Sequence, residues 1–296
     1  MKNKTFDSWV EKGSFLSVSG RTIFVIDTNK QPINKPILCI LHGFPTSSFD
    51  YWKVIDQLAK EYRVIIHDHL GFGLSDKPID YSYSLVDQTD IAIKLWEQLN
   101  VESAIILAHD YGTSIATELM ARDNLGHLKI KIEQFVLCNG SIHIELAKLR
   151  VMQKLLRNRF IGNFIAKISS KAILSKNLKN IYFDPSKIDQ DEIDTIWSMM
   201  IRNNGRHVLA QVSRYTIERH VLWHRWIGAL QQTKRPIKIL WPKNDPIAIA
   251  EMAKVIFKET KHSQLVWLPN VGHFPMLEKP ALWTDEVIKS INNPIC

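Results

Sequence analysis

Residues 104–112 constrain this chain more than any other stretch. The apolar run Ala104-Ile105-Ile106-Leu107 leads into Ala108-His109-Asp110-Tyr111-Gly112, and a helix-like segment follows. In the second run, small residues flank a central Asp110. This is the pattern of a nucleophile elbow, a sharp strand-to-helix turn whose strain lifts one side chain clear of the sheet. Serine is the usual central residue, so aspartate here predicts chemistry other than ordinary ester hydrolysis.

The composition fits a globular protein with a sizeable core. The chain has 296 residues, of which 45% are hydrophobic and 23% charged, and this length allows one large α/β domain. No apolar signal-peptide core is visible near residue 1, and no apolar run approaches the roughly 18 residues of a membrane span. Cys39, Cys138 and Cys296 are too few and too widely spaced to indicate disulfides or a zinc site. We therefore expect a cytoplasmic location.

Strands and helices alternate along most of the chain. Segments with the length and apolar character of strands lie at 15–18, 21–26, 36–41, 63–67, 104–108, 132–138, 237–241 and 264–268. The first two read as a hairpin, and the residues before about 13 as an exposed lead-in. The continuous apolar runs suit strands that are buried on both faces. The order predicts an eight-stranded, mostly parallel sheet with helices on both faces.

The alternation stops between residues 141 and 230, where helical spacing of apolar residues replaces strand-like runs. This predicts an all-helical insert after the sixth strand. The sequence thus divides into a first core part (1–140), a helical cap (141–230) and a second core part (231–296). The cap is expected to lie over the carboxyl edge of the sheet, where ligands of α/β proteins bind.

The formal net charge is +8, and nine basic residues with no acidic one lie between Lys148 and Lys179. No nucleic-acid-binding motif accompanies them, so we expect no nucleic-acid partner. The favoured interpretation is a solvated face of the cap. The alternative is a peripheral contact with a membrane surface or anionic lipid through 148–179, because the apolar residues between the charges fall at helical spacing.

Two short patterns are set aside. Gly71 and Gly73 begin a dinucleotide fingerprint, but position 76 is aspartate and Pro78 prevents an immediate helix. His67 and His69 could form a metal pair, but no third ligand motif accompanies them. We expect neither a cofactor nor a metal, and only a small-molecule substrate with water.

Asp110, Asp245 and His273 each follow a predicted strand, in the chain order nucleophile, acid, histidine. Each has an ordinary interpretation taken singly: a turn residue, a helix N-cap and a structural histidine. Their joint occurrence in this order favours a catalytic triad. In it, the Asp245 carboxylate would accept the Nδ1–H of His273 and stabilise the imidazolium.

Five stretches carry a resemblance to known proteins: Leu41-His42-Gly43-Phe44-Pro45-Thr46-Ser47-Ser48, Leu70-Gly71-Phe72-Gly73-Leu74-Ser75-Asp76-Lys77-Pro78, His109-Asp110-Tyr111-Gly112, Ile201-Arg202-Asn203-Asn204 and Arg225-Trp226-Ile227-Gly228-Ala229-Leu230. With them, the chain resembles the α/β-hydrolase superfamily, in the aspartate-nucleophile branch of epoxide hydrolases and haloalkane dehalogenases. Within that branch it resembles the mesoderm-specific transcript group and its bacterial relatives. The resemblance covers nearly the whole chain and implies the α/β-hydrolase fold.

The mechanism implied by that branch also follows from carboxylate chemistry. Asp110 attacks an sp³ carbon and forms an ester on the enzyme. His273 then activates a water that hydrolyses this ester. Backbone N–H groups of Phe44 and Tyr111 are expected to hold the oxyanion, while His42 and His109 make hydrogen bonds behind this loop.

The leaving group separates the two known reactions. An epoxide oxygen needs an acidic O–H from the cap, and Tyr215 resembles one such tyrosine; Tyr182 is a second candidate without a supporting motif. Plain packing is the alternative role for both. A halide needs N–H donors, whereas Tyr111 and Phe44 stand where those donors would be expected. Since both reactions usually place tryptophan after the nucleophile, Tyr111 leaves the substrate open.

The sequence favours an epoxide hydrolase-like enzyme on a small or lipophilic substrate over a haloalkane dehalogenase-like one. A different class of function is a catalytically quiet hydrolase-fold protein that binds a lipid or a partner at a membrane surface. The presence of every triad residue favours the enzyme.

Overall fold

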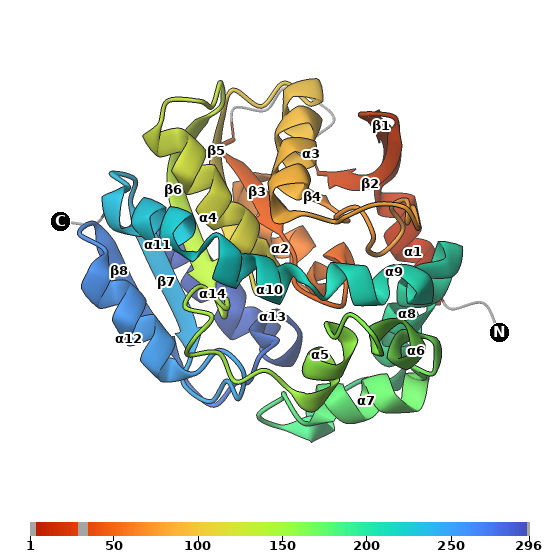
Figure 1. Ribbon diagram of the computed structural model, residues 1–296. Helices are drawn as coiled ribbons and strands as arrows, with labels where there is room; N and C mark the ends of the chain where they lie inside the picture. Colours follow the sequence, from red (N-terminus) through yellow and green to blue (C-terminus); the bar gives the residue numbers. More distant parts are fainter. Residues whose placement is uncertain (1–3, 29–34, 295–296) are drawn as a thin grey trace.

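One eight-stranded sheet forms the centre of the computed structural model, which describes residues 4–28 and 35–294 (Figure 1). The strand order is β1-β2-β4-β3-β5-β6-β7-β8. β1 and β2 pair antiparallel, β2 pairs antiparallel with β4, and the other neighbours are parallel. The strands are β1 (Ser14–Val18), β2 (Arg21–Asp27), β3 (Ile37–Leu41), β4 (Arg63–His67), β5 (Ser103–His109), β6 (Lys131–Cys138), β7 (Ile237–Pro242) and β8 (Ser263–Leu268). The predicted fold class is confirmed.

The central strands are buried on both faces because their side chains alternate between two apolar layers. In β5, Ile106 packs into one buried cluster and Ile105 and Leu107 into the other. The first cluster includes residues of α3 (Leu85–Gln98), α4 (Tyr111–Asn124), α11 (Trp223–Gln232) and α12 (Ala250–Glu259). The second includes residues of α1 (Lys4–Lys12), α2 (Ile55–Glu61), α13 (Pro275–Glu278) and α14 (Pro280–Asn292). Continuous apolar runs are therefore required in these strands.

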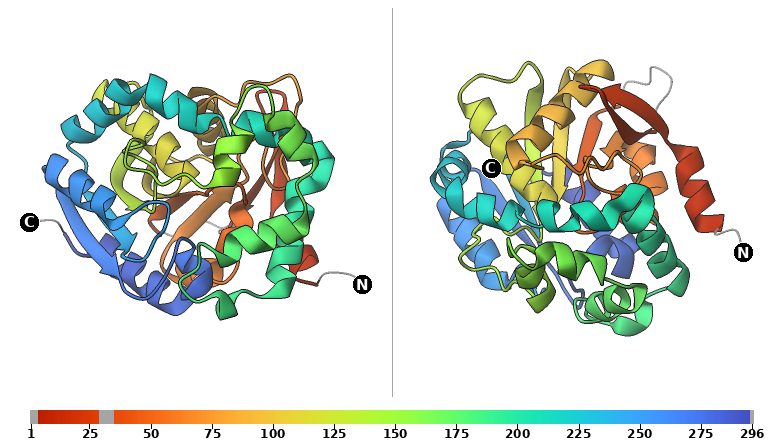
Figure 2. Two further views of the ribbon diagram at one scale, coloured as in Figure 1. Left: turned by 60° about the horizontal axis from the view of Figure 1, so that its bottom comes forward. Right: turned by 45° about the vertical axis from the view of Figure 1, so that its right-hand side comes forward.

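The core helices cover the two faces of the sheet (Figures 1 and 2). They are α1 (Lys4–Lys12), α2 (Ile55–Glu61), α3 (Leu85–Gln98), α4 (Tyr111–Asn124), α12 (Ala250–Glu259), α13 (Pro275–Glu278) and α14 (Pro280–Asn292). α1 corrects the expectation of an exposed lead-in. Its Trp9 is buried, meets Phe49 edge to face and donates to Ser48 Oγ at 3.3 Å.

Seven α-helices lie between β6 and β7, in the segment predicted to form the cap. They are α5 (Val151–Leu156), α6 (Gly162–Lys167), α7 (Lys171–Lys179), α8 (Gln190–Ile201), α9 (Gly205–Val212), α10 (Tyr215–Val221) and α11 (Trp223–Gln232). α5 to α9 form one group beside the sheet (Figure 2), whereas α11 packs along α4 of the core. The exact boundaries of a cap domain stay a prediction.

Glu118 on α4 anchors α11, the helix that leads from the cap segment back to the core. Its buried carboxylate accepts hydrogen bonds from Arg122 of α4 and from Arg225 and Trp226 of α11, at 2.7 to 2.9 Å. Burial raises the pKa of Glu118, but these hydrogen bonds outweigh it and lower that pKa. The carboxylate therefore stays charged while α11 covers it.

Replacing Glu118 by alanine removes an acceptor from two guanidinium groups and leaves the buried indole N–H of Trp226 without its acceptor, although Arg122 keeps Asp90. We expect a loss of about 3 kcal/mol in the free energy of unfolding, measured by urea denaturation. Because the folded pKa is lowered, the stabilisation by Glu118 is present at neutral pH and is lost as the pH falls through that pKa. The exposed Glu251→Ala variant is the control, with a change within about 0.5 kcal/mol. Equal stabilities of the two variants would contradict this role.

Candidate active site

Asp110 lies on the sharp turn between β5 and α4, with φ 45° and ψ −110°. The turn brings the helix start against β3: a Cβ added to Gly112 would lie 2.2 Å from the carbonyl oxygen of Leu41. Glycine is therefore required at position 112. The side chain of Asp110 is buried, and its Oδ2 accepts the backbone N–H of Phe44 at 2.9 Å. Its Oδ1 has no hydrogen-bond partner within the described residues.

His273 and Asp245 meet at the carboxyl ends of neighbouring strands. His273 Nδ1 lies 2.7 Å from Asp245 Oδ2, and both side chains are buried. The other oxygen of Asp245, Oδ1, accepts the backbone N–H groups of Ile247 and Ala248 at 2.7 and 3.0 Å. The carboxylate thus binds the imidazole and its own loop at once. It is not a helix N-cap, because α12 (Ala250–Glu259) begins five residues later with Ile249 as its N-cap.

Charge coupling sets the protonation of this cluster. Burial would lower the pKa of His273, but Asp245, followed by Asp110 and Asp50, outweighs it and raises that pKa to about 9. For Asp245, burial acts to raise the pKa and His273 reverses the effect, so its pKa is lowered. Burial raises the pKa of Asp110, opposed by His273 and the Phe44 N–H. His273 is therefore a buried cation that lies between the carboxyl groups of Asp245 and Asp110.

His42 and His109 contact the backbone of the two loops that meet at the site, the loop after β3 and the loop that carries His273. The His42 ring lies with Nδ1 2.8 Å from the Gly43 carbonyl oxygen, and its Nε2 accepts the backbone N–H of His69. His109 Nε2 lies 2.8 Å from the carbonyl oxygen of His273, so it is the protonated nitrogen. Burial lowers the pKa of both rings to about 3, which keeps them neutral.

The two cap tyrosines occupy different surroundings. Tyr215 packs on Tyr111 and Phe44, with ring centroids 4.9 and 5.7 Å away, and its buried hydroxyl has no partner within the described residues. After burial, the charge of Asp110 is the next cause that raises the Tyr215 pKa. Tyr182 packs instead on Phe274, at 6.2 Å, beside the histidine loop. Tyr215 is therefore the tyrosine that lies over Asp110 and the Phe44 loop.

Two contributors were missed by the sequence analysis. Asn139 follows β6 with φ 50°, and its Nδ2 donates to Asp245 Oδ2 at 2.6 Å. The run Asn139-Gly140 at a strand end was the available signal. Asp50 is fully buried and accepts a hydrogen bond from Thr46 Oγ1, and burial raises its pKa well above the ordinary value. Nothing in the sequence places Asp50 near His273.

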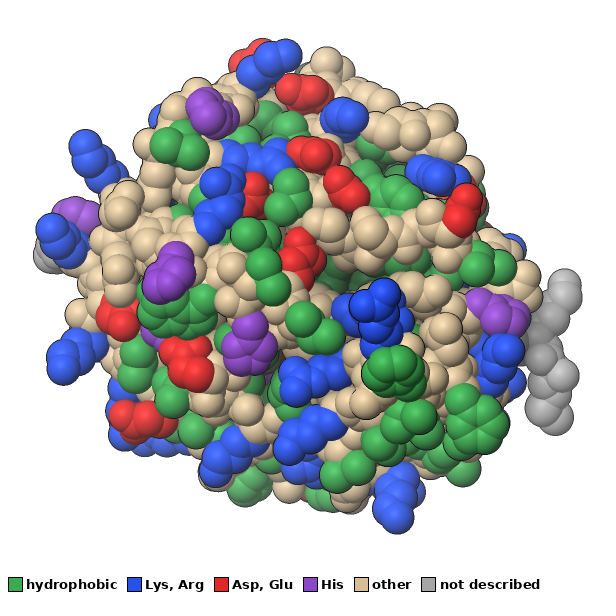
Figure 3. Space-filling view, viewed as in Figure 1, with side chains coloured by type: hydrophobic (Ala, Val, Ile, Leu, Met, Phe, Trp, Pro, Cys, Tyr) green, Lys and Arg blue, Asp and Glu red, His purple; other side chains and the backbone are tan. Residues whose placement is uncertain are grey.

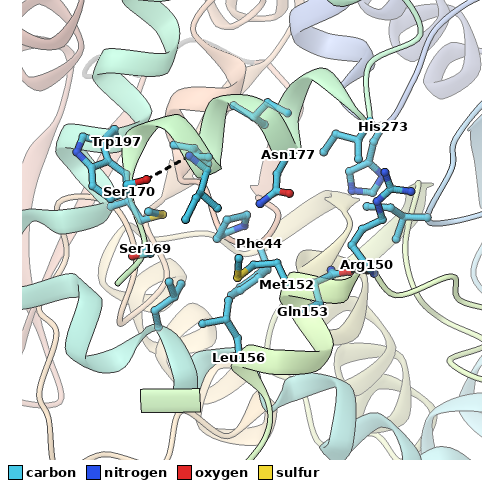
Figure 4. A pocket seen from close by; sticks show the side chains of 18 of the residues that line it. Phe44, Arg150, Met152, Gln153, Leu156, Ser169, Ser170, Asn177, Trp197 and His273 are labelled. Atoms are coloured by element: carbon cyan, nitrogen blue, oxygen red, sulfur yellow. Dashed lines mark hydrogen bonds between the residues drawn. The ribbon is translucent and has the colours of Figure 1, made fainter. Parts of the chain in front are cut away.

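A cavity of about 90 Å³ opens beside His273 and Phe44 under the cap (Figure 4). Its walls come mainly from α5 and α7 and are largely apolar. Arg150, Gln153 and Asn177 add polar groups, and Asn177 lies between Phe44 and His273 in Figure 4. The apolar lining includes Met152, Leu156, Ile173, Leu174, Leu178, Ile181, Trp197, Met200, Leu209, Ile247 and Phe274. This is a site for a small, mostly apolar molecule.

Other features of the sequence have ordinary surroundings. His67 Nε2 lies 3.2 Å from His69 Nδ1, and residues 4–28 and 35–294 contain no group of three or more His, Cys, Asp or Glu side chains able to hold a metal. Cys39 and Cys138 are buried free thiols, while Cys296 lies outside the described residues. No helix in the described part of the chain is long and apolar enough to cross a membrane.

The sheet order, the elbow and the histidine loop together define an α/β hydrolase, and the comparisons agree. A profile of the alpha/beta hydrolase fold matches residues 36–280, so the chain belongs to this family. It is 31% identical to the putative hydrolase LipZ of Mycobacterium tuberculosis over 97% of this chain and 98% of that protein. It is 30% identical to the mesoderm-specific transcript protein of Mus musculus, over 97% of this chain and 88% of that protein. The expected relationship to this group is confirmed.

A solved structure, the epoxide hydrolase CorEH without ligand, superposes with a TM-score of 0.76 at 18% identity, covering 94% of this chain and 98% of that one. At this identity the likeness establishes the shared fold.

The coupling predicts an order of effects on the pKa of His273, measurable by NMR titration of the imidazole. We expect a wild-type pKa of about 9. Asp245→Asn should lower it the most and Asp110→Asn less, because Asp245 is both the hydrogen-bond partner and the stronger charge. The exposed Asp56→Asn variant is the control. With a raised folded pKa, the contribution of His273 to stability is complete below pH 6.5 and is lost as the pH rises toward 9. A wild-type value at or below 6.5 would contradict the coupling.

Proposed function

We propose that this α/β hydrolase acts through a covalent ester on Asp110 and opens an epoxide. The observation that carries the proposal is a carboxylate on the strained elbow, bonded to the Phe44 N–H at 2.9 Å, beside the buried His273–Asp245 pair. A carboxylate is a competent nucleophile at an sp³ carbon, and the ester it forms needs a separate hydrolytic step.

In the first step, a carboxylate oxygen of Asp110 attacks an epoxide carbon. The new C–O bond forms as the ring C–O bond breaks, and the ring oxygen takes a proton from the Tyr215 hydroxyl. This assignment rests on the place of Tyr215 over Tyr111 and Phe44 and on its free hydroxyl within the described residues. The side chains of Tyr111 and Phe44 carry no N–H for a halide, which favours an epoxide over a haloalkane.

In the second step, His273 takes a proton from water, and the resulting hydroxide attacks the ester carbonyl of Asp110. The backbone N–H groups of Phe44 and Tyr111 stabilise the oxyanion that forms. The intermediate collapses with cleavage of the acyl C–O bond, and the proton of its hydroxyl group passes to the departing alkoxide. The diol then leaves and the Asp110 carboxylate returns. The tyrosinate left by the first step takes the resting proton of His273, and the proton that His273 then takes from water restores the imidazolium, so atoms and charges balance.

The electrostatic coupling between Asp110 and His273 explains why ester formation precedes ester hydrolysis. While Asp110 is ionised, its charge helps to keep the pKa of His273 near 9. Esterification makes Asp110 neutral, so the pKa of His273 falls. Its proton passes to the tyrosinate that the first step leaves, and the imidazole becomes available as a base. His273 is thereby switched on by the intermediate that it must hydrolyse.

The cavity supports a small or lipophilic substrate, since its walls are largely apolar. Neither proposed step requires a metal or an organic cofactor. A haloalkane dehalogenase-like reaction would use the same ester and differs only in the group that receives the leaving atom.

Substituting His273 by glutamine removes the base of the second step, so the ester should accumulate. Incubation with a panel of epoxides and haloalkanes, followed by intact-protein mass spectrometry, should give an adduct that maps to the peptide containing Asp110. His262→Gln, at an exposed histidine, is the matched control and should turn over without accumulating adduct. The double variant Asp110→Asn/His273→Gln should remain unmodified. An adduct on another residue would contradict the assignment, and co-purified lipid with no adduct would favour the catalytically quiet alternative.

Tyr215→Phe separates the two leaving groups. Loss of the acidic O–H should slow ester formation from an epoxide about 10²–10⁴-fold and leave that from an alkyl halide nearly unchanged. The rates are those of adduct growth in the His273→Gln background. Tyr182→Phe, whose ring packs on Phe274, should have a much smaller effect. An unchanged epoxide rate in Tyr215→Phe would rule out this proton donor.

A further inference from the structure

The outer face of the cap exposes large apolar side chains that belong to neither of the two core clusters. Phe160 is 91% exposed and Phe164 is 64% exposed, in and just before α6, and Val151 and Ile168 are also more than half exposed. Figure 3 shows hydrophobic side chains gathered over α6 and α7, next to lysine and arginine side chains. An exposed apolar cluster of this kind marks a surface that another phase or molecule covers.

The same segment is basic, and its charges are almost all unpaired. Between 148 and 179, only Lys171 forms an ion pair in the described part of the chain, with Asp194 at 3.0 Å. The remaining basic residues are Lys148, Arg150, Lys154, Arg157, Arg159, Lys167, Lys176 and Lys179. Acidic side chains nearby therefore do not neutralise most of this positive charge, which is available to an external anion.

A groove beside α5 concentrates these charges. Lys154, Arg157 and Arg159 line one side of it, and Arg214 and His220 come from around α10. Asn158 and Ile217 complete the lining, which contains no carboxylate. The Nε of Arg214 is buried and has no hydrogen-bond partner within the described residues. Such a groove fits a phosphate group carried by a larger molecule.

We propose that the outer face of α5–α7 docks on an anionic phospholipid membrane, with lipid phosphates in the groove and Phe160 and Phe164 in the interfacial layer. Charge complementarity and exposed apolar side chains on one surface are the combination that binds such interfaces. The aliphatic side chains of Val151 and Ile168 gain from a lipid layer but cannot stack on bases, which favours membrane over nucleic acid.

The docking surface and the cavity belong to the same helices. Met152 and Leu156 of α5 and Leu174 of α7 face the cavity, as does Arg150, while Lys154, Arg159 and the exposed apolar residues of this segment face outward. Docking is independent of the proposed reaction, because none of its residues contacts Asp110 or His273 among the described interactions.

Vesicle flotation tests the docking with two independent variants. Wild type should float at low salt with vesicles of phosphatidylcholine containing about one third phosphatidylglycerol, but not with pure phosphatidylcholine, and high salt should release it. Lys154→Gln/Arg159→Gln should weaken partitioning about 25-fold, at about fivefold for each charge near the surface. Phe160→Ser/Phe164→Ser should weaken it as well, without changing the thermal unfolding midpoint, because both side chains are exposed.

Matched controls lie on and beside α12, away from the cap. Lys258→Gln/Lys261→Gln removes two exposed charges and Phe257→Ser removes an aromatic ring that is 46% exposed; both should partition like wild type. Equal loss in patch and control variants, or equal binding to neutral vesicles, would overturn the proposal. Release by inorganic phosphate at constant ionic strength would instead identify a free-phosphate site, and binding of single-stranded RNA in place of vesicles would identify a nucleic-acid surface. Either result would overturn docking on membranes.

Discussion

The close approach of α4 to β3 is the constraint on which the site depends. Gly112 lies against the Leu41 carbonyl, and the turn that brings it there holds Asp110 at a positive φ. The turn directs the Asp110 carboxylate toward the backbone N–H of Phe44, a residue in the loop that follows β3. One backbone contact therefore fixes the nucleophile position and the loop that faces it. The strain stored there is offset by the buried sheet and helices around it.

Buried charge governs the rest of the site. The cluster is buried, so solvent screens it little and each charge is stabilised mainly by its neighbours. Asp245 is stabilised by His273, Asn139 and two backbone N–H groups, and His273 by three carboxyl groups. A change of charge at Asp110 must therefore be felt at His273. In the proposed reaction this coupling replaces any need for a separate switch.

Much of this arrangement could be predicted from sequence. Apolar runs and the small residues of the elbow act locally, so the strands, the elbow and the histidine and aspartate loops were all visible. The helical insert was visible because strand-like runs stop at residue 141. The burial of Trp9 and Asp50 could not be predicted, because it depends on partners distant in sequence, such as Phe49 for Trp9. Asn139 was missed because an Asn-Gly pair after a strand ordinarily means only a turn. Tyr182 and Tyr215 could not be ranked until packing separated them.

The origin of the product oxygen tests the central proposal, a covalent ester on Asp110, most directly. In a single turnover of excess enzyme in H₂¹⁸O, the ester mechanism delivers an oxygen of Asp110 to the product, which stays unlabelled, and ¹⁸O enters the Asp110 carboxylate. Mass spectrometry of the product and of the peptide containing Asp110 measures both. A labelled first-turnover product with an unlabelled Asp110 would mean that water attacks the substrate directly, and it would contradict the account.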